Sequence, residues 1–79
     1  MSTSSAALLV HCQIALGLTQ KALGDLLGRD GRTIQRWQEK GTDLMPDQAR
    51  TLADALLRVR PDLAEQVLKL GRQTALAAG

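Results

Sequence analysis

Aromatic side chains are nearly missing from this 79-residue chain, which has no phenylalanine or tyrosine and a single tryptophan, Trp37. With one cysteine, Cys12, the chain can form neither an internal disulfide nor a cysteine-based zinc site. Cys12 follows the only histidine, His11, among aliphatic neighbours, a pattern that predicts a buried thiol beside a surface imidazole. We expect no metal and no cofactor.

The residues that enzyme sites need are also scarce. One histidine, no tyrosine, no recognisable pair of acids and no phosphate-binding glycine loop leave little for acid–base or metal chemistry. No apolar run approaches the length of a membrane span, and no basic segment precedes a hydrophobic one at the N-terminus. The sequence predicts a cytoplasmic protein that is not an enzyme, does not contact membranes and has no evident small-molecule ligand.

The charge balance is mild, with ten lysines and arginines against eight aspartates and glutamates, a net charge of +2. Such an excess is compatible with nucleic-acid binding but does not require it. It predicts modest nonspecific affinity, so a DNA-binding protein of this composition would depend on dimerisation or on specific contacts.

Good helix formers dominate the chain, and no alternating pattern typical of strands is visible. The length predicts one domain over residues 1–79, and its helix-breaking residues divide it into five helical segments. Expected helix starts carry capping residues or a proline at the first position: Thr19, Asp30, Pro46 and Pro61. Expected stops are Gly17, Gly28, Gly41 and Gly71, the last of which ends or interrupts the final helix. The predicted fold is a compact all-α bundle of about five short helices.

Apolar spacing indicates which faces turn inward. The segment from Pro46 has Ala49, Leu52, Ala53, Leu56 and Leu57 at helical spacing. In the segment before it, Ile34 and Trp37 are three residues apart and share one face, while Arg32, Gln35, Arg36 and Glu39 fall opposite. We therefore expect Trp37 to pack inside the protein and not to stack on a nucleic-acid base.

The segments on either side of Gly28 are joined by only a few residues, which favours steeply crossed helices, as in a helix-turn-helix. A close crossing requires a small residue at the contact, and Gly24 provides one. Gly28 can adopt the left-handed conformation that ends a helix.

The string GLTQKALGDLLGRDGRTIQRWQEKG resembles the lambdoid repressor and Cro (XRE-like) family of helix-turn-helix domains. Four positions after Gln20 comes Gly24, and Gly28, Ile34 and Trp37 follow at eight, fourteen and seventeen. These are the family's spacings for its small contact residue, its turn glycine and two core residues. The resemblance extends over about residues 6–58.

Several residues depart from the family pattern. Arg29 and Gln38 replace a usual apolar residue and a usual glutamate, and Gly31 leaves one base-reading position without a side chain. Gly24 replaces the commoner alanine, which should cost up to about 1 kcal/mol of helix stability.

The resemblance implies a second helix of the pair that enters the major groove of double-stranded DNA. Arginine suits guanine and glutamine suits adenine, so the base-reading candidates are Arg32, Gln35 and Arg36. By the same resemblance Gln20, at a helix N-terminus, would bind a phosphate. Plausible backbone contacts near it are Lys21, Arg29, Lys40 and Thr42.

Residues 61–79 extend beyond the resemblance and carry an apolar stripe of Leu63, Val67 and Leu70. Part of this stripe could cover the domain's own core, and the remainder could form a two-fold homodimer interface. We therefore expect a homodimeric transcriptional regulator, with a repressor favoured, that reads a palindromic operator. The alternative is a helical protein–protein module of the anti-repressor or antitoxin type. The polar face of Arg32, Gln35 and Arg36 argues against it, because interface centres prefer apolar anchors.

Overall fold

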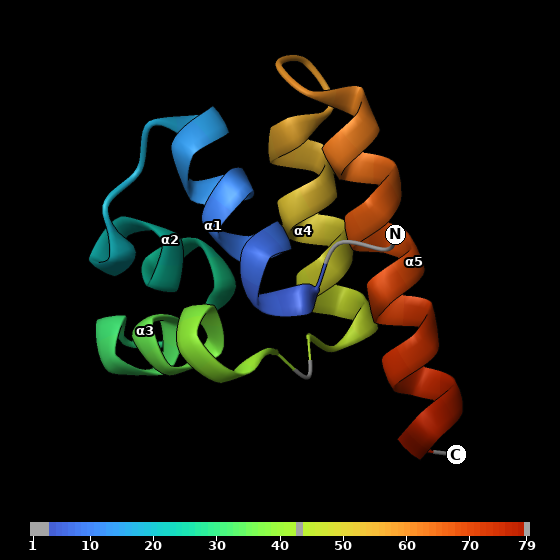
Figure 1. Ribbon diagram of the computed structural model, residues 1–79. Coiled ribbons are helices and arrows are strands. Elements are labelled where there is room, and N and C mark those ends of the chain that lie inside the picture. The colour runs from blue at the N-terminus through green and yellow to red at the C-terminus, as the bar shows by residue number, and fades with distance from the viewer. Residues whose placement is uncertain (1–3, 43, 79) are drawn as a thin grey trace.

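The computed structural model describes residues 4–42 and 44–78, which form five α-helices joined by short loops (Figure 1). The helices are α1 (Ser5–Leu16), α2 (Gln20–Leu27), α3 (Gly31–Lys40), α4 (Pro46–Leu56) and α5 (Pro61–Ala78). No strand occurs in these two ranges. The expectation of an all-α fold of about five helices is confirmed.

All but one of the predicted boundary residues lie at helix ends. The hydroxyl of Thr19 accepts a hydrogen bond from the N–H of Ala22 at 3.0 Å, and the carboxylate of Asp30 accepts one from Thr33 at 2.8 Å. Each bond satisfies a backbone donor that the first helical turn leaves free. Gly28 ends α2 with φ of 71°, a left-handed conformation in which a side chain would be strained.

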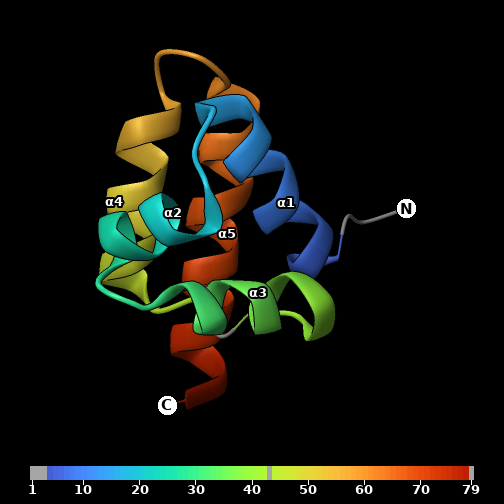
Figure 2. The same ribbon diagram turned by 90° about the vertical axis from the view of Figure 1, so that its left-hand side faces the viewer.

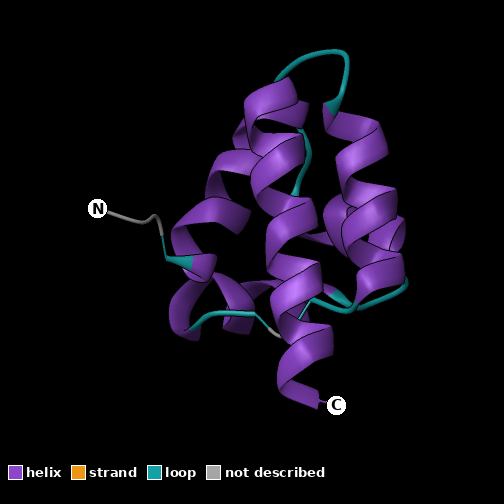
Figure 3. Cartoon of the chain, turned by 90° about the vertical axis from the view of Figure 1, so that its right-hand side faces the viewer, coloured by secondary structure: helices purple, strands orange, loops and turns teal. Residues whose placement is uncertain are grey.

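The expectation that Gly71 ends or interrupts the last helix is wrong. The helix α5 runs through it to Ala78 and packs along α4 as an antiparallel pair (Figures 1 and 3). Gly71 is buried against α4, where an added Cβ atom would lie 2.5 Å from the Cβ of Ala49. The glycine therefore brings the two helices close together and does not stop one of them.

The core is aliphatic and draws on all five helices. Its buried members are Leu8, Leu9, Cys12, Leu23, Leu27, Ile34, Leu44, Ala49, Leu52, Ala53, Leu56, Leu63, Ala64 and Val67. Cys12 is fully buried, as expected, and burial raises the pKa of its thiol to about 11, against the opposing charge of Arg60. Leu57 does not belong to the core and is 61% exposed, because α4 ends at Leu56 and the chain turns outward there.

Two of the three residues predicted for the dimer interface, Leu63 and Val67, do not fit that role. Leu63 and Val67 are only 3% and 1% exposed because they fill the protein's own core, and Leu70 is half-buried against it. Side chains already covered within one chain cannot bury themselves again against a second copy. The apolar stripe of α5 is therefore an intramolecular packing surface.

No single helix in residues 4–42 and 44–78 is long and apolar enough to cross a membrane. Only α1 and α2 taken together pass by length and composition, and they bend by 102° at their junction. Within the same residues, no group of three histidine, cysteine or acidic side chains could hold a metal ion.

Candidate nucleic-acid interface

The candidate site is built on α2 and α3, which three residues connect. The N–H of Arg29 donates to the carbonyl oxygen of Gly24 at 2.7 Å, so the chain folds back over the last turn of α2. An added Cβ on Gly24 would lie 2.6 Å from the carbonyl oxygen of Arg29. Gly24 is thus needed at a close contact, as expected, but the partner is the backbone of the connection and not a side chain of α3.

The helix α3 lies across one end of the bundle (Figure 2). Ile34 is its only fully buried side chain among the described residues, which confirms its predicted place in the core. Trp37 packs against the core but is only half-buried, so the prediction of an interior indole holds in part. The guanidinium of Arg29 lies 6.0 Å from the centroid of its rings, within the range of a cation–π contact.

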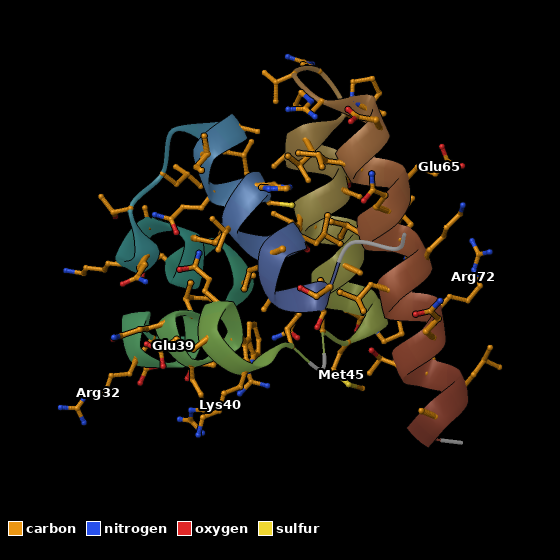
Figure 4. All side chains as sticks on the ribbon, in the orientation of Figure 1. Arg32, Glu39, Lys40, Met45, Glu65 and Arg72 are labelled. Carbon is orange, nitrogen blue, oxygen red and sulfur yellow. The ribbon has the colours of Figure 1, made fainter. Side chains whose placement is uncertain are left out.

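The opposite face of α3 is open to solvent. Its exposed side chains are Arg32, Gln35, Arg36, Glu39 and Lys40. Figure 4 shows Arg32 and Lys40 pointing away from the rest of the molecule. All three base-reading candidates of the sequence therefore lie on one accessible face, as their spacing predicted.

Positive charge runs along this face. Arg32, Arg36 and Lys40 follow one another at intervals of four residues, which places them in one row on a helix. Two acids moderate the row. Glu39 accepts a hydrogen bond of 3.5 Å from Gln35, and Asp30 caps the helix. Hydrogen bonds from Thr33, and to a lesser extent the charges of Arg32 and Arg36, hold the pKa of Asp30 below its usual value.

A chain of three glutamine side chains joins three helices behind this face. The Nε2 of Gln20, the first residue of α2, donates to the Oε1 of Gln38 on α3 at 2.9 Å. The Nε2 of Gln38 in turn donates to the Oε1 of Gln13 on α1. All three side chains are half-buried. The sequence indicated Gln38 only as a departure from a family pattern, and it gave no sign of Gln13.

The candidates for phosphate contact differ in how exposed they are. Lys21, Arg29 and Lys40 are exposed. Lys40 is the last residue of α3, Arg29 lies in the connection before it, and the Cα atom of Lys21 lies 3.7 Å from where a Cβ on Gly31 would be. Gln20 is half-buried at the start of α2. Thr42 does not fit the prediction. It is only 7% exposed, its hydroxyl is buried, and its N–H donates to the hydroxyl oxygen of Ser5 at 3.1 Å.

Comparison of the chain with models of protein families, with curated proteins and with solved structures found no match in any of the three.

Proposed function

We propose that this chain is a sequence-specific DNA-binding regulator of transcription, in which α2 and α3 act as a helix-turn-helix. One observation carries the proposal. The face of α3 opposite the buried Ile34 is exposed and bears Arg32, Gln35 and Arg36. These are side chains that pair with base edges in the major groove, and α3 lies at an end of the bundle where a duplex can approach it (Figure 2).

The surroundings of α3 suit the DNA backbone. Lys21 on α2, Arg29 in the connection and Lys40 at the end of α3 are all exposed cations. Gln20 lies at the N-terminus of α2, where free N–H groups and the helix dipole favour an anion. Phosphate contacts of this kind place a protein on the duplex, and base contacts then supply specificity.

We further propose that the regulator acts as a homodimer on a palindromic operator, with half-sites about 34 Å apart, and that it works in the cytoplasm as a repressor. One module of this size would bury little DNA surface by itself. The two-fold interface cannot rest on Leu63 and Val67, which are buried within the chain. Light scattering measures the oligomeric state, and a monomer both with and without operator would refute the dimer.

A fluorescence anisotropy titration tests DNA binding. Labelled duplexes of mixed sequence are titrated at several salt concentrations, and a bound sequence is then selected from randomised duplexes. We expect affinity to fall steeply with salt, as it does when phosphates release counterions.

Arg36→Ala and Gln35→Ala should each weaken discrimination between the selected and the mixed sequence by about 1–3 kcal/mol. Arg72→Ala is the matched control, because Arg72 is an exposed arginine on α5, directed away from α3 (Figure 4). Binding that is absent or independent of salt would refute the proposal and favour a protein–protein module.

A further inference from the structure

Apolar packing holds α3 at few points. Ile34 is its only fully buried side chain among the described residues. Trp37, three residues later, is half-buried. Apolar contacts are non-directional, so a single buried isoleucine limits the rotation of a helix about its axis only weakly. Rotation matters in this helix, because a turn of a few tens of degrees would move every outward side chain away from its base.

Hydrogen bonds provide the missing direction. At about 100° per residue, Gln38 lies on the side of Ile34 opposite Trp37. Its amide has one acceptor and one donor end, and both are used, the oxygen by Gln20 of α2 and the nitrogen by Gln13 of α1. One side chain of α3 is thus bound to two other helices in two directions. Ile34, Trp37 and Gln38 together fix both the position and the rotation of α3.

We infer that Gln38 and Gln13 are positioning residues that determine sequence specificity by setting the rotation of α3, without contacting DNA themselves. This inference rests on the proposed function. The bond from Gln20 adds a second consequence, because the side chain assigned to a phosphate is held by the helix assigned to the bases. The distance between the proposed phosphate contact at Gln20 and the base-reading face of α3 is therefore held constant.

The experiment compares affinity for a selected sequence with affinity for mixed-sequence DNA in four proteins. Gln38→Met and Gln13→Met remove the amides while keeping the length of the side chain. Gln38→Glu keeps two acceptor oxygens, one for Gln20 and one for a Gln13 amide that has turned over. Gln66→Met is the matched control, because Gln66 is a half-buried glutamine on α5.

We expect Gln38→Met to lower the ratio of the two affinities by about tenfold, the discrimination of one base contact, and to leave mixed-sequence binding nearly unchanged. Gln13→Met should act in the same direction. Gln38→Glu should weaken both affinities because of its charge and preserve their ratio. A merely structural role would lower both affinities together, in step with the folded fraction measured by circular dichroism.

A measurement without DNA distinguishes a positioning role of Gln38 from a merely structural one. NMR order parameters of residues 31–40 should fall in Gln38→Met, while those of α4 and α5 should stay constant. An unchanged affinity ratio in Gln38→Met, or one that Gln38→Glu fails to preserve, would overturn the positioning role and leave DNA binding standing. Unchanged order parameters would overturn it as well. If the intact chain binds no DNA, the proposed function itself fails.

Discussion

The helices α3 and α5 are both packed on one side and open on the other, yet they are held in different ways. Four residues of α5, Leu63, Ala64, Val67 and Gly71, are buried against the bundle. On α3 only Ile34 is buried, Trp37 is half-buried against the core, and two hydrogen bonds of Gln38 connect the helix to α2 and α1.

Their charges differ in the same way. The two ion pairs among the described residues lie on or beside α5, Lys69–Glu65 at 3.9 Å and Arg60–Asp62 at 2.9 Å. The helix α5 is thus held mainly by buried apolar residues, whereas α3 has one buried isoleucine and presents mostly polar groups.

The largest expected effect follows from truncating a buried side chain of the α4–α5 pair. Leu52 of α4 is fully buried, so Leu52→Ala should lower the free energy of unfolding by about 2–5 kcal/mol. Arg36→Ala on the exposed face of α3 should change it by less than about 0.5 kcal/mol. Urea unfolding followed by circular dichroism measures both. Equal losses of unfolding free energy in the two variants would contradict the difference in packing between α3 and the α4–α5 pair.

The next effect concerns the contact between α4 and α5. Gly71→Ala should destabilise the protein by about 1–3 kcal/mol, the usual cost of overpacking, because its Cβ would meet Ala49 at 2.5 Å. The double variant with Ala49→Gly removes the clash and should recover part of the loss in thermal unfolding. A neutral Gly71→Ala would show that the helices separate easily.

A smaller effect is expected at Gly24 on α2, for which Gly31 on α3 serves as a control. Gly24→Ala should cost about 1–2 kcal/mol although alanine is the better helix former, because its Cβ meets the carbonyl oxygen of Arg29 at 2.6 Å. Gly31→Ala is the control, since its nearest neighbour lies at an ordinary 3.7 Å. We expect Gly31→Ala to be neutral or slightly stabilising in the same thermal unfolding experiment.

The smallest effect depends on pH. Hydrogen bonding to Thr33 lowers the pKa of Asp30 in the folded protein below its ordinary value of 3.8. A lowered pKa contributes stability that is present above the ordinary value and is lost as the pH falls through the folded one. Asp30→Ala should therefore be slightly less stable than the natural protein near neutral pH, and the difference should shrink as the pH falls below the ordinary value of 3.8 and through the lower pKa of the folded protein. A difference that persists in acid would assign the effect to another cause.

Local chemistry could be predicted from the sequence, whereas side-chain partners across helices could not. The caps at Thr19 and Asp30 and the turn at Gly28 depend on neighbouring residues, so spacing was sufficient. The outward face of α3 followed from helical period alone. Gly71 departs from the prediction because a buried glycine and a helix-ending glycine look the same in a sequence.

The remaining differences also involve contacts between distant segments. The stripe of Leu63 and Val67 was correctly recognised as apolar, but the sequence does not tell whether the same chain or a second copy covers it. Thr42 follows α3 in the sequence, which suggests a DNA contact, but it is buried and its N–H donates to Ser5, far away at the start of α1. The chain of Gln13, Gln38 and Gln20 joins three helices, which no local pattern indicates.

Because Cys12 is the only cysteine and is fully buried with a pKa of about 11, it can report the kinetics of opening. A thiol reagent attacks the thiolate of an accessible cysteine, so labelling near neutral pH must wait for α1 to separate from the core. The rate of labelling then measures how often the interior opens under native conditions. Trp37 is half-buried on α3, so its fluorescence should also respond to a loosening of α3 that leaves this thiol covered. The labelling rate of Cys12 would thus report the opening of the core, and the fluorescence of Trp37 would report the loosening of α3.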